Sequence, residues 1–269
     1  MKKIQMVDLQ SQYEKIKPQI DSAINEVIAS AAFINGPEVK NFQTDLEAYL
    51  GVKHVIPCAN GTDALQIAMM GLGLEQGDEV ITADFTFAAT VEVIALLKLT
   101  PVLVDVDPKS FNIDLEAVRK AITPKTKCVM PVHMCGSMAD MDALVAICKE
   151  HNLILLEDAC QSIGGTYKGK HLGTIGHAGT FSFDFVKTIT CGEGGVVMTN
   201  DQEVYIKSDA FTDHGHDHLG VDRGADLHPA LGYNFRISEL HAAVGVAQIK
   251  KLDTFLAIQK KNNQILRSY

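Results

Sequence analysis

The chain has 269 residues, of which 46% are hydrophobic, and its formal net charge at pH 7 is −9. A chain of this size can bury one large core, and its acidic balance argues against nucleic-acid binding, which needs clustered lysine and arginine. No apolar run approaches the roughly twenty residues that span a bilayer, and the start MKKIQMVDLQ has no secretory hydrophobic segment, so no membrane partner is expected.

Short runs rich in β-branched residues alternate with segments of helical periodicity along the chain. This alternation predicts βα units around a mainly parallel sheet. The expected strands cover residues 54–59, 79–84, 100–107, 126–133, 152–158, 179–184 and 194–200. The expected helices cover residues 14–30, 37–50, 61–73, 86–98, 114–122, 139–151, 202–211 and 237–268. No strand follows the last, long helix, so we expect the chain to stop short of a further domain.

The first candidate site segment is CANGTDALQIAMM, which passes from an expected strand into an expected helix. Exposed amides and the positive end of a helix dipole suit a phosphate there, with Gly61 allowing close approach and Thr62 adding a hydroxyl. An ordinary helix start, with Asn60 as N-cap and Asp63 in the first turn, explains the same letters. The glycine spacing matches neither a Walker loop nor a dinucleotide fingerprint.

Two phenylalanines follow the next expected strand, in the segment ADFTFAAT. Either Phe85 or Phe87 can stack on a flat heteroaromatic ring at this sheet edge, and either can belong to the core. The periodicity favours the core for one of them.

The most specific pair of residues is Asp158, which ends the apolar run NLILLED, and Lys187 in FSFDFVKTITCGEGG. Apolar side chains flank this lysine: Phe181, Phe183, Phe185, Val186 and Ile189. Desolvation among them would make the amine a better nucleophile, and an acid at a strand end lies where α/β sheets bind ligands. A lysine for a Schiff base and an acid for a pyridinium nitrogen suit pyridoxal phosphate. The alternatives are a lysine extending to solvent and an aspartate capping a helix.

The segment DHGHDHLGVDRGADLH carries His214, His216, His218 and His228 among acidic residues and glycines. Alternating histidines in a strand would share a face and suit a metal, but glycine and aspartate favour a polar loop. The six cysteines form no CxxC pair. We therefore expect no metal site, reduced thiols and a cytoplasmic protein.

Together these motifs resemble a known family. The resemblance is carried, in chain order, by NGTDAL, FTF with a following AT, ADMDAL, LEDACQS, FSF before a lysine, GEGG and LGYNFRISELHAAVG. They occur in this order in sugar aminotransferases of the DegT/DnrJ/EryC1/StrS type, which are fold-type I pyridoxal-phosphate enzymes. The resemblance implies an α/β three-layer sandwich with a mainly parallel seven-stranded sheet. It also implies a helical segment over 1–35, a cofactor-binding large domain over 36–236, and a helix over 237–269 that leads to a missing C-terminal small domain.

The resemblance also assigns roles to single residues. Lys187 would hold pyridoxal 5′-phosphate covalently and shuttle protons, Asp158 would pair with the pyridine nitrogen, and Gln161, one helical turn later, would lie near the ring hydroxyl. These three would act on the reactive part of the cofactor.

Other residues would hold the rest of the cofactor. Gly61, Thr62 and Ser182 would bind the phosphate, and Phe87 would stack on the ring. Asn234 matches a position that reaches the phosphate from the neighbouring subunit. The resemblance therefore implies a homodimer with shared active sites.

Three departures from the family pattern concern substrate-facing regions. Asp184, Phe185 and Val186 stand where many relatives have a proline before the lysine, residues 133–136 lack an aromatic, and the histidine-rich loop is uncommon. His133 and His214 are candidate substrate contacts. These features resemble a subgroup that includes 8-amino-3,8-dideoxy-octulosonate transaminases.

The implied activity is transamination of a keto- or aldehydo-sugar, nucleotide-linked or a sugar acid, with glutamate as amino donor, for amino sugars of cell-surface glycans such as lipopolysaccharide. Ping-pong kinetics are expected. Related sugar dehydratases replace the lysine with histidine, and Lys187 argues against that activity. The alternative is a non-catalytic or regulatory cofactor-binding homologue that lacks the C-terminal domain.

Overall fold

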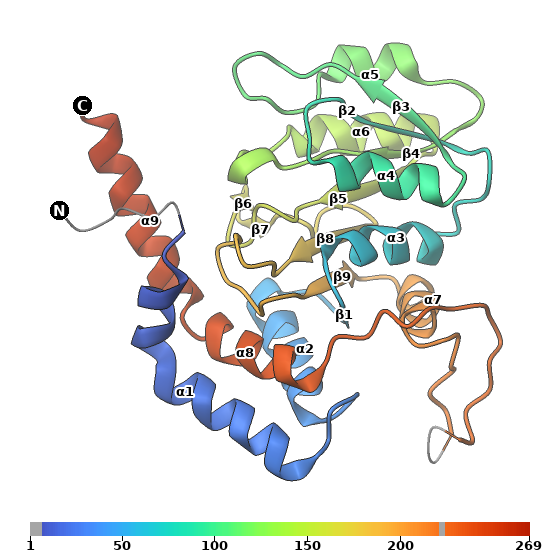
Figure 1. Ribbon diagram of the computed structural model, residues 1–269. Coiled ribbons are helices and arrows are strands. Elements are labelled where there is room, and N and C mark those ends of the chain that lie inside the picture. The colour runs from blue at the N-terminus through green and yellow to red at the C-terminus, as the bar shows by residue number, and fades with distance from the viewer. Residues whose placement is uncertain (1–6, 221–223) are drawn as a thin grey trace.

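The computed structural model describes residues 7–220 and 224–269. Residues 1–6 of the expected N-terminal segment and 221–223 of the histidine-rich loop lie outside the described residues. A seven-stranded sheet forms the centre (Figure 1). In spatial order its strands are β1 (His54–Cys58), β9 (Gly195–Thr199), β8 (Ala178–Ser182), β5 (Ile154–Asp158), β4 (Thr126–Met130), β2 (Glu79–Ala83) and β3 (Thr100–Val104).

The sheet is mainly parallel, which confirms the predicted fold class. Strand β9 pairs antiparallel with both of its neighbours, β1 and β8, and the remaining pairs are all parallel. Each strand expected from the sequence is present and is one to three residues shorter than expected, and β8 begins one residue earlier than expected. Strands that are buried on both faces appear in a sequence as continuous hydrophobic runs rich in β-branched residues, and for this reason such strands can be predicted from the sequence.

Helices cover both faces of the sheet and complete three layers (Figure 1). One face carries α3 (Gly61–Gly71), α4 (Ala88–Leu96) and α7 (Gln202–Thr212); the other carries α2 (Pro37–Leu50), α5 (Leu115–Ala121), α6 (Met141–His151) and α8 (Glu239–Ile249). Successive strand side chains alternate between these layers, so Leu156 packs beneath α3 while Leu155 packs beneath α6.

Side-chain caps define where many of these helices begin. Asn60, Asp114, Asp140, Asp201 and Ser238 each precede a helix and accept a hydrogen bond from a backbone amide of its first turn. Such caps satisfy amides that have no partner within the helix, and each contributes about 1 kcal/mol. The expected helix starts therefore rest on a local interaction.

The N-terminal helix α1 (Leu9–Ser30) lies against α8, outside the sheet layers (Figure 1). Ile16 and Ile20 of α1 are buried against Ala247 of α8. Within the described residues, no helix is both long enough and apolar enough to cross a membrane. All six cysteines are free thiols.

Two local features differ from the sequence prediction. The expected helix over 237–268 is interrupted after α8, and α9 (Leu252–Arg267) begins anew. Helix α8 is almost wholly buried, whereas only Leu252 of α9 is buried, so the break falls where the chain leaves the core. A short hairpin of β6 (Thr166–Tyr167) and β7 (Lys170–His171) was not expected, because two-residue strands carry no periodic signal.

Candidate functional site

A pocket of about 590 Å³ lies beside the last residue of β5 and the first turns of α3 and α4. It is lined by all but one of the predicted cofactor contacts: Gly61, Thr62, Phe87, Asp158, Gln161, Ser182 and Lys187. The first and the last of these residues, Gly61 and Lys187, are 126 positions apart in the chain. Since the carboxyl ends of parallel strands meet at one edge of a sheet, the fold brings them together.

Asp158 ends β5, and its side chain is 4% exposed. The hydroxyl of Thr90 donates a hydrogen bond to Oδ2 of Asp158 (2.8 Å), and the backbone N–H of Cys160 donates to Oδ1 (3.2 Å). A buried carboxylate needs such donors, because an unpaired buried charge is strongly unfavourable. Asp158 is thus held as an acceptor at the wall of the pocket.

Lys187 follows β8 in a turn that is closed by a hydrogen bond from its own N–H to the carbonyl of Asp184 (3.0 Å). The lysine is half-buried and lines the pocket. The expected apolar enclosure is wrong. Three of its expected members belong to the core instead: Phe181, Phe183 and Ile189. The other two, Phe185 and Val186, line the pocket beside Lys187 but are exposed, because they lie in the turn after β8 and not in the strand.

The start of α3 forms a cradle suited to an anion. Oδ1 of Asn60 accepts a hydrogen bond from the backbone amide of Asp63 (2.9 Å), so the predicted cap exists. The backbone amides of Gly61 and Thr62 come before Asp63 in the first turn of the helix. A Cβ on Gly61 would lie 2.6 Å from Cβ of Ser182. Only glycine allows this approach, and the amides, the Ser182 hydroxyl and the helix dipole together fit a phosphate.

Phe87 is the N-cap residue of α4, lies at the pocket wall and is 68% exposed. Phe85 is 48% exposed and contacts the ring of Phe111, with ring centroids 5.3 Å apart. The expectation that one of Phe85 and Phe87 lies in the core is wrong. Residues 84–87 lie between β2 and α4, so neither strand nor helix periodicity applies to them.

Gln161 lies in a run of turns after β5, not one helical turn after Asp158 as expected. Its Oε1 accepts a hydrogen bond from the backbone N–H of Cys135 (3.2 Å). Cys135 belongs to η1 (Met134–Gly136) and has a positive φ of 51°. Gln161 thereby ties the loop after β4 to the pocket wall.

His133 does not face the pocket, and its predicted contact with substrate is wrong in this structure. The ring is 0% exposed, and its Nε2 lies 2.9 Å from Oε2 of Glu157, which is also 0% exposed. Glu157 further accepts hydrogen bonds from the backbone amides of Gly173, Ile175 and Gly176 (2.7–2.8 Å). Because side chains alternate along β5, Glu157 points away from the Asp158 face, and this network supports the strand beneath the pocket.

Replacing Glu157 by glutamine is expected to destabilise the fold by about 2–4 kcal/mol. An amide NH₂ in place of Oε2 would face two donors, the Gly173 amide and the His133 ring. The measurement is the free energy of unfolding in urea. Glu150→Gln, at a glutamate whose side chain is 58% exposed, is the matched control and should change it by less than about 0.5 kcal/mol. Equal effects of the two substitutions would contradict the prediction.

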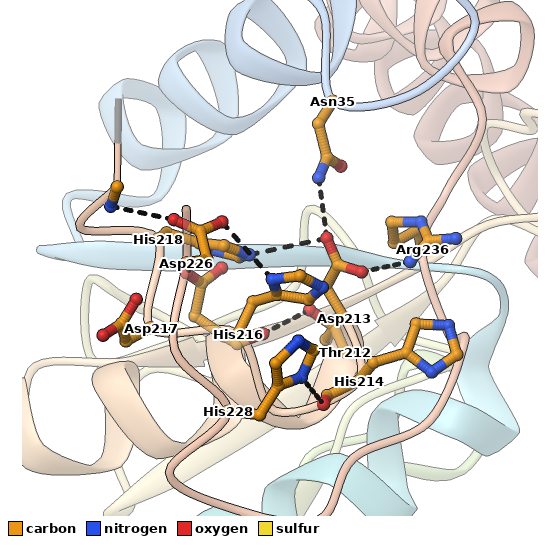
Figure 2. Close-up of polar contacts among 12 residues, drawn as sticks. Asn35, Thr212, Asp213, His214, His216, Asp217, His218, Asp226, His228 and Arg236 are labelled. Atoms are coloured by element: carbon orange, nitrogen blue, oxygen red, sulfur yellow. Dashed lines mark hydrogen bonds and ion pairs between the residues drawn. The ribbon is translucent and has the colours of Figure 1, made fainter. Parts of the chain in front are cut away.

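The histidine-rich loop lies between α7 and α8 and is organised by aspartates (Figure 2). Asp213 is buried and contacts Arg236 and the side-chain amide of Asn35. Asn234 is exposed, and its backbone forms an isolated antiparallel β-bridge with that of Asp213. His214 is also exposed. Neither Asn234 nor His214 lines the 590 Å³ pocket, and their roles as contacts to cofactor and substrate remain predictions.

The loop histidines interact with carboxylates and with one another (Figure 2). Nδ1 of His216 lies 3.3 Å from Asp226, and the ring centroids of His216 and His228 are 4.1 Å apart. In the described part of the chain, no group of three or more histidine, cysteine, aspartate or glutamate side chains is arranged to hold a metal. A neighbouring cavity of about 640 Å³ is lined by His218, Asp209 and Asp213.

Stability should depend on pH through His218. Its hydrogen bond to Asp209 (2.8 Å), aided by the charge of Asp213, raises the pKa of His218 above the ordinary value of 6.5. The protonated form of His218 is therefore favoured in the folded protein. Its contribution to the free energy of unfolding is fully present below about pH 6.5 and is lost as the pH rises through the raised pKa. The side chain is 33% exposed, so screening keeps the effect below about 1 kcal/mol.

The corresponding measurement compares urea midpoints of the wild type and His218→Gln at pH 6 and pH 9. The urea midpoint of the wild type should exceed that of the variant at both pH values, and the difference should be larger at pH 6 than at pH 9. A difference that grows with pH would have the wrong sign for this pair.

Sequence reasoning missed Thr90, whose hydroxyl bonds to Asp158, and Thr86, which bonds to Thr90. Thr86 lies before α4 and Thr90 lies in its first turn, so neither strand nor helix periodicity of the sequence marks the pair.

Comparison with known proteins shows the family of the chain. Residues 14–269 match the DegT/DnrJ/EryC1/StrS aminotransferase family. The chain is 43% identical over 260 residues to a pleiotropic regulatory protein of Geobacillus stearothermophilus, covering 96% of this chain and 68% of that protein. It is 39% identical over 259 residues to the UDP-2-acetamido-2-deoxy-3-oxo-D-glucuronate aminotransferase of Pseudomonas aeruginosa, covering 96% and 70%.

A solved structure from Bacillus subtilis with bound cofactor PMP is also similar. It shares 33% sequence identity with a TM-score of 0.82, and the match covers 88% of this chain and 53% of that one. The chain thus spans between 53% and 70% of these three proteins.

Proposed function

Because the chain belongs to the DegT/DnrJ/EryC1/StrS aminotransferase family, we propose that it is a pyridoxal-phosphate-dependent enzyme that transfers an amino group to a keto- or aldehydo-sugar. The observation that carries the proposal is the single pocket that joins Lys187, Asp158 and the cradle of Gly61 and Ser182. A nucleophilic amine, an acid at a strand end and an anion site are the groups that this cofactor requires.

The bound cofactor supplies an electrophilic aldehyde and a ring that accepts electrons. Asp158, at the buried end of β5, would hold a proton on the ring nitrogen through its negative charge. Lys187 would hold the cofactor through its amine, and the same amine, once free, would accept a proton from the donor's α-carbon as general base and return it as general acid.

The remaining residues bind and orient. The amides of Gly61 and Thr62 and the hydroxyl of Ser182 hold the phosphate at the start of α3. Phe87, exposed at the pocket wall, would cover one face of the ring, and Gln161 would bind the ring hydroxyl. Their effect is to fix the reacting atoms relative to Lys187, which lowers the entropic part of the barrier.

The finer proposals concern the partners. The amino donor is glutamate, and the acceptor is a keto-sugar, which the name of the Pseudomonas relative supports. The product is an amino sugar for cell-surface glycans. The enzyme works as a homodimer in which Asn234 of each subunit completes the phosphate site of the other. The exposure of Asn234, outside the pocket of its own chain, is consistent with this.

Mixing two inactive variants checks the shared site. In a mixed dimer of Lys187→Ala and Asn234→Ala chains, one of the two sites has both native residues. Random pairing of equal amounts should therefore restore about a quarter of the wild-type activity by symmetry. If no activity returns although mixed dimers form, Asn234 does not act across the interface.

A second candidate function is favoured by one comparison. The Geobacillus relative is named as a regulatory protein, so a cofactor-binding regulator that does not transfer amino groups is the alternative.

Visible spectroscopy separates the two. The purified chain should be yellow with pyridoxal phosphate, lose its visible band on addition of glutamate, and regain it with the correct acceptor from a panel of nucleotide-linked keto-sugars and the 8-oxo form of 3,8-dideoxy-octulosonate. A coloured protein that ignores every amino donor would support the regulator. A colourless protein that binds no added cofactor would exclude both.

A further inference from the structure

Two threonine hydroxyls are connected to Asp158 by successive hydrogen bonds, and neither has a role in the proposed function so far. Thr90 is 1% exposed, and its Oγ1 lies 2.8 Å from Oδ2 of Asp158. Oγ1 of Thr86 lies 2.8 Å from Oγ1 of Thr90. Both residues belong to the segment that begins α4, on either side of its N-cap Phe87. The three side chains therefore form a hydrogen-bonded row that ends at the pocket.

The direction of these hydrogen bonds follows from the chemistry of the groups. A carboxylate accepts hydrogen bonds and donates none, so the Thr90 hydroxyl must donate its only hydrogen to Asp158. The contact between the two threonines can then form only if Thr86 donates to Thr90. Each hydroxyl thus orients the next, and the first bond strengthens the second because aligned hydrogen bonds polarise one another.

The row also limits how Asp158 can turn. Oδ2 is held from the α4 side by Thr90, and Oδ1 is held by the amide of Cys160 (3.2 Å). Rotation of the carboxylate would break both contacts at a residue that is only 4% exposed, where water does little to replace lost hydrogen bonds. In addition, the positive end of the α4 dipole favours a negative charge beside its first turn.

We infer that Thr90 is a positioning residue of the proposed cofactor site: its hydroxyl, oriented by Thr86, holds the Asp158 side chain in one rotamer, from which it would face the ring nitrogen. The inference rests on the proposed function. The start of α4 also places Phe87 at the pocket wall. One local element would therefore position both the side chain that stacks on the cofactor ring and, through Thr90, the carboxylate that pairs with the ring nitrogen.

The test uses a pair of substitutions that separate the hydroxyl from the methyl group. Thr90→Val keeps the shape and removes the donor, whereas Thr90→Ser keeps the donor and removes the methyl group. Three quantities are measured for each: the dissociation constant of pyridoxal phosphate from the apo-protein, the rate at which glutamate bleaches the visible band, and the melting temperature of the apo-protein.

Thr90→Val should weaken cofactor binding and slow bleaching by about tenfold to a hundredfold, the range expected for a hydrogen bond to a charged group. Thr90→Ser should restore most of the loss. Thr86→Val should have a smaller effect in the same direction. It should add little to Thr90→Val in the double variant, since Thr86 acts only through Thr90.

Several outcomes overturn the inference while leaving the proposed function intact. One is wild-type binding and bleaching in Thr90→Val. Another is equal impairment by valine and serine, which would assign the effect to methyl packing. A third is a lowered melting temperature with an unchanged dissociation constant, which would make Thr90 merely structural. A wild-type chain that binds no pyridoxal phosphate overturns the proposed function and this inference together.

Discussion

Replacing Lys187 by alanine is expected to abolish amino transfer, with a rate loss of at least about 10⁴-fold. Among the described residues that line the pocket, Lys187 is the only lysine or arginine, so no other side chain there can supply the amine. The fold should tolerate the change. The hydrogen bond that closes the turn uses the backbone N–H of Lys187, which alanine retains. The measurement is the single-turnover rate of the spectral change with glutamate.

A chemical trap gives a second readout for this variant. Borohydride reduction of the wild type with bound cofactor should leave a pyridoxyl group on the peptide that contains Lys187, detectable by mass spectrometry. The variant should show no such peptide. Lys168→Ala, at an exposed lysine paired with Asp142, is the control and should behave as wild type. Full transamination by Lys187→Ala would remove this residue from the mechanism.

Replacing Asp158 by asparagine is expected to slow the glutamate-dependent reaction by about 10²–10³-fold, with weaker cofactor binding. The amide has nearly the same shape but no charge, so it cannot stabilise a protonated ring nitrogen. The low exposure of Asp158, 4%, means that solvent does little to compensate.

Kinetics and binding together identify the cause of this loss. The rate of bleaching at saturating cofactor reports the proton shift, and the dissociation constant reports binding. Asp142→Asn removes one negative charge from an exposed position and serves as the control for net charge. A near-wild-type bleaching rate in Asp158→Asn would show that the charge at this strand end is dispensable.

Much of the fold could be predicted because it depends on local patterns. Central strands such as β8 and β9 are buried on both faces and so appear as continuous apolar runs, and helix starts such as Asn60 and Ser238 are set by caps within four residues. The break before Leu252 could not be predicted, since it depends on where α8 ends its contact with α1 and α2. Helical periodicity continues across the break without a signal.

The candidate site shows the same division. Gly61, Asp158 and Lys187 occupy positions with a local signature, and the pocket contains all three. His133 was assigned to substrate although its partner, Glu157, lies 24 positions away on the neighbouring strand. Burial of that pair depends on strand pairing, which no window of the sequence around His133 contains.

By itself, the sequence determined the family, the order of strands and helices, and the chemical types of the residues proposed for the cofactor. Those properties follow from residue identity and from interactions over a few positions. Only the tertiary structure decided that Phe181 and Phe183 pack away from Lys187, that His133 supports β5 from below, and that Thr90 donates to Asp158. The physical reason is that the side of a strand on which a residue lies, and what it meets there, depend on segments far apart in the chain.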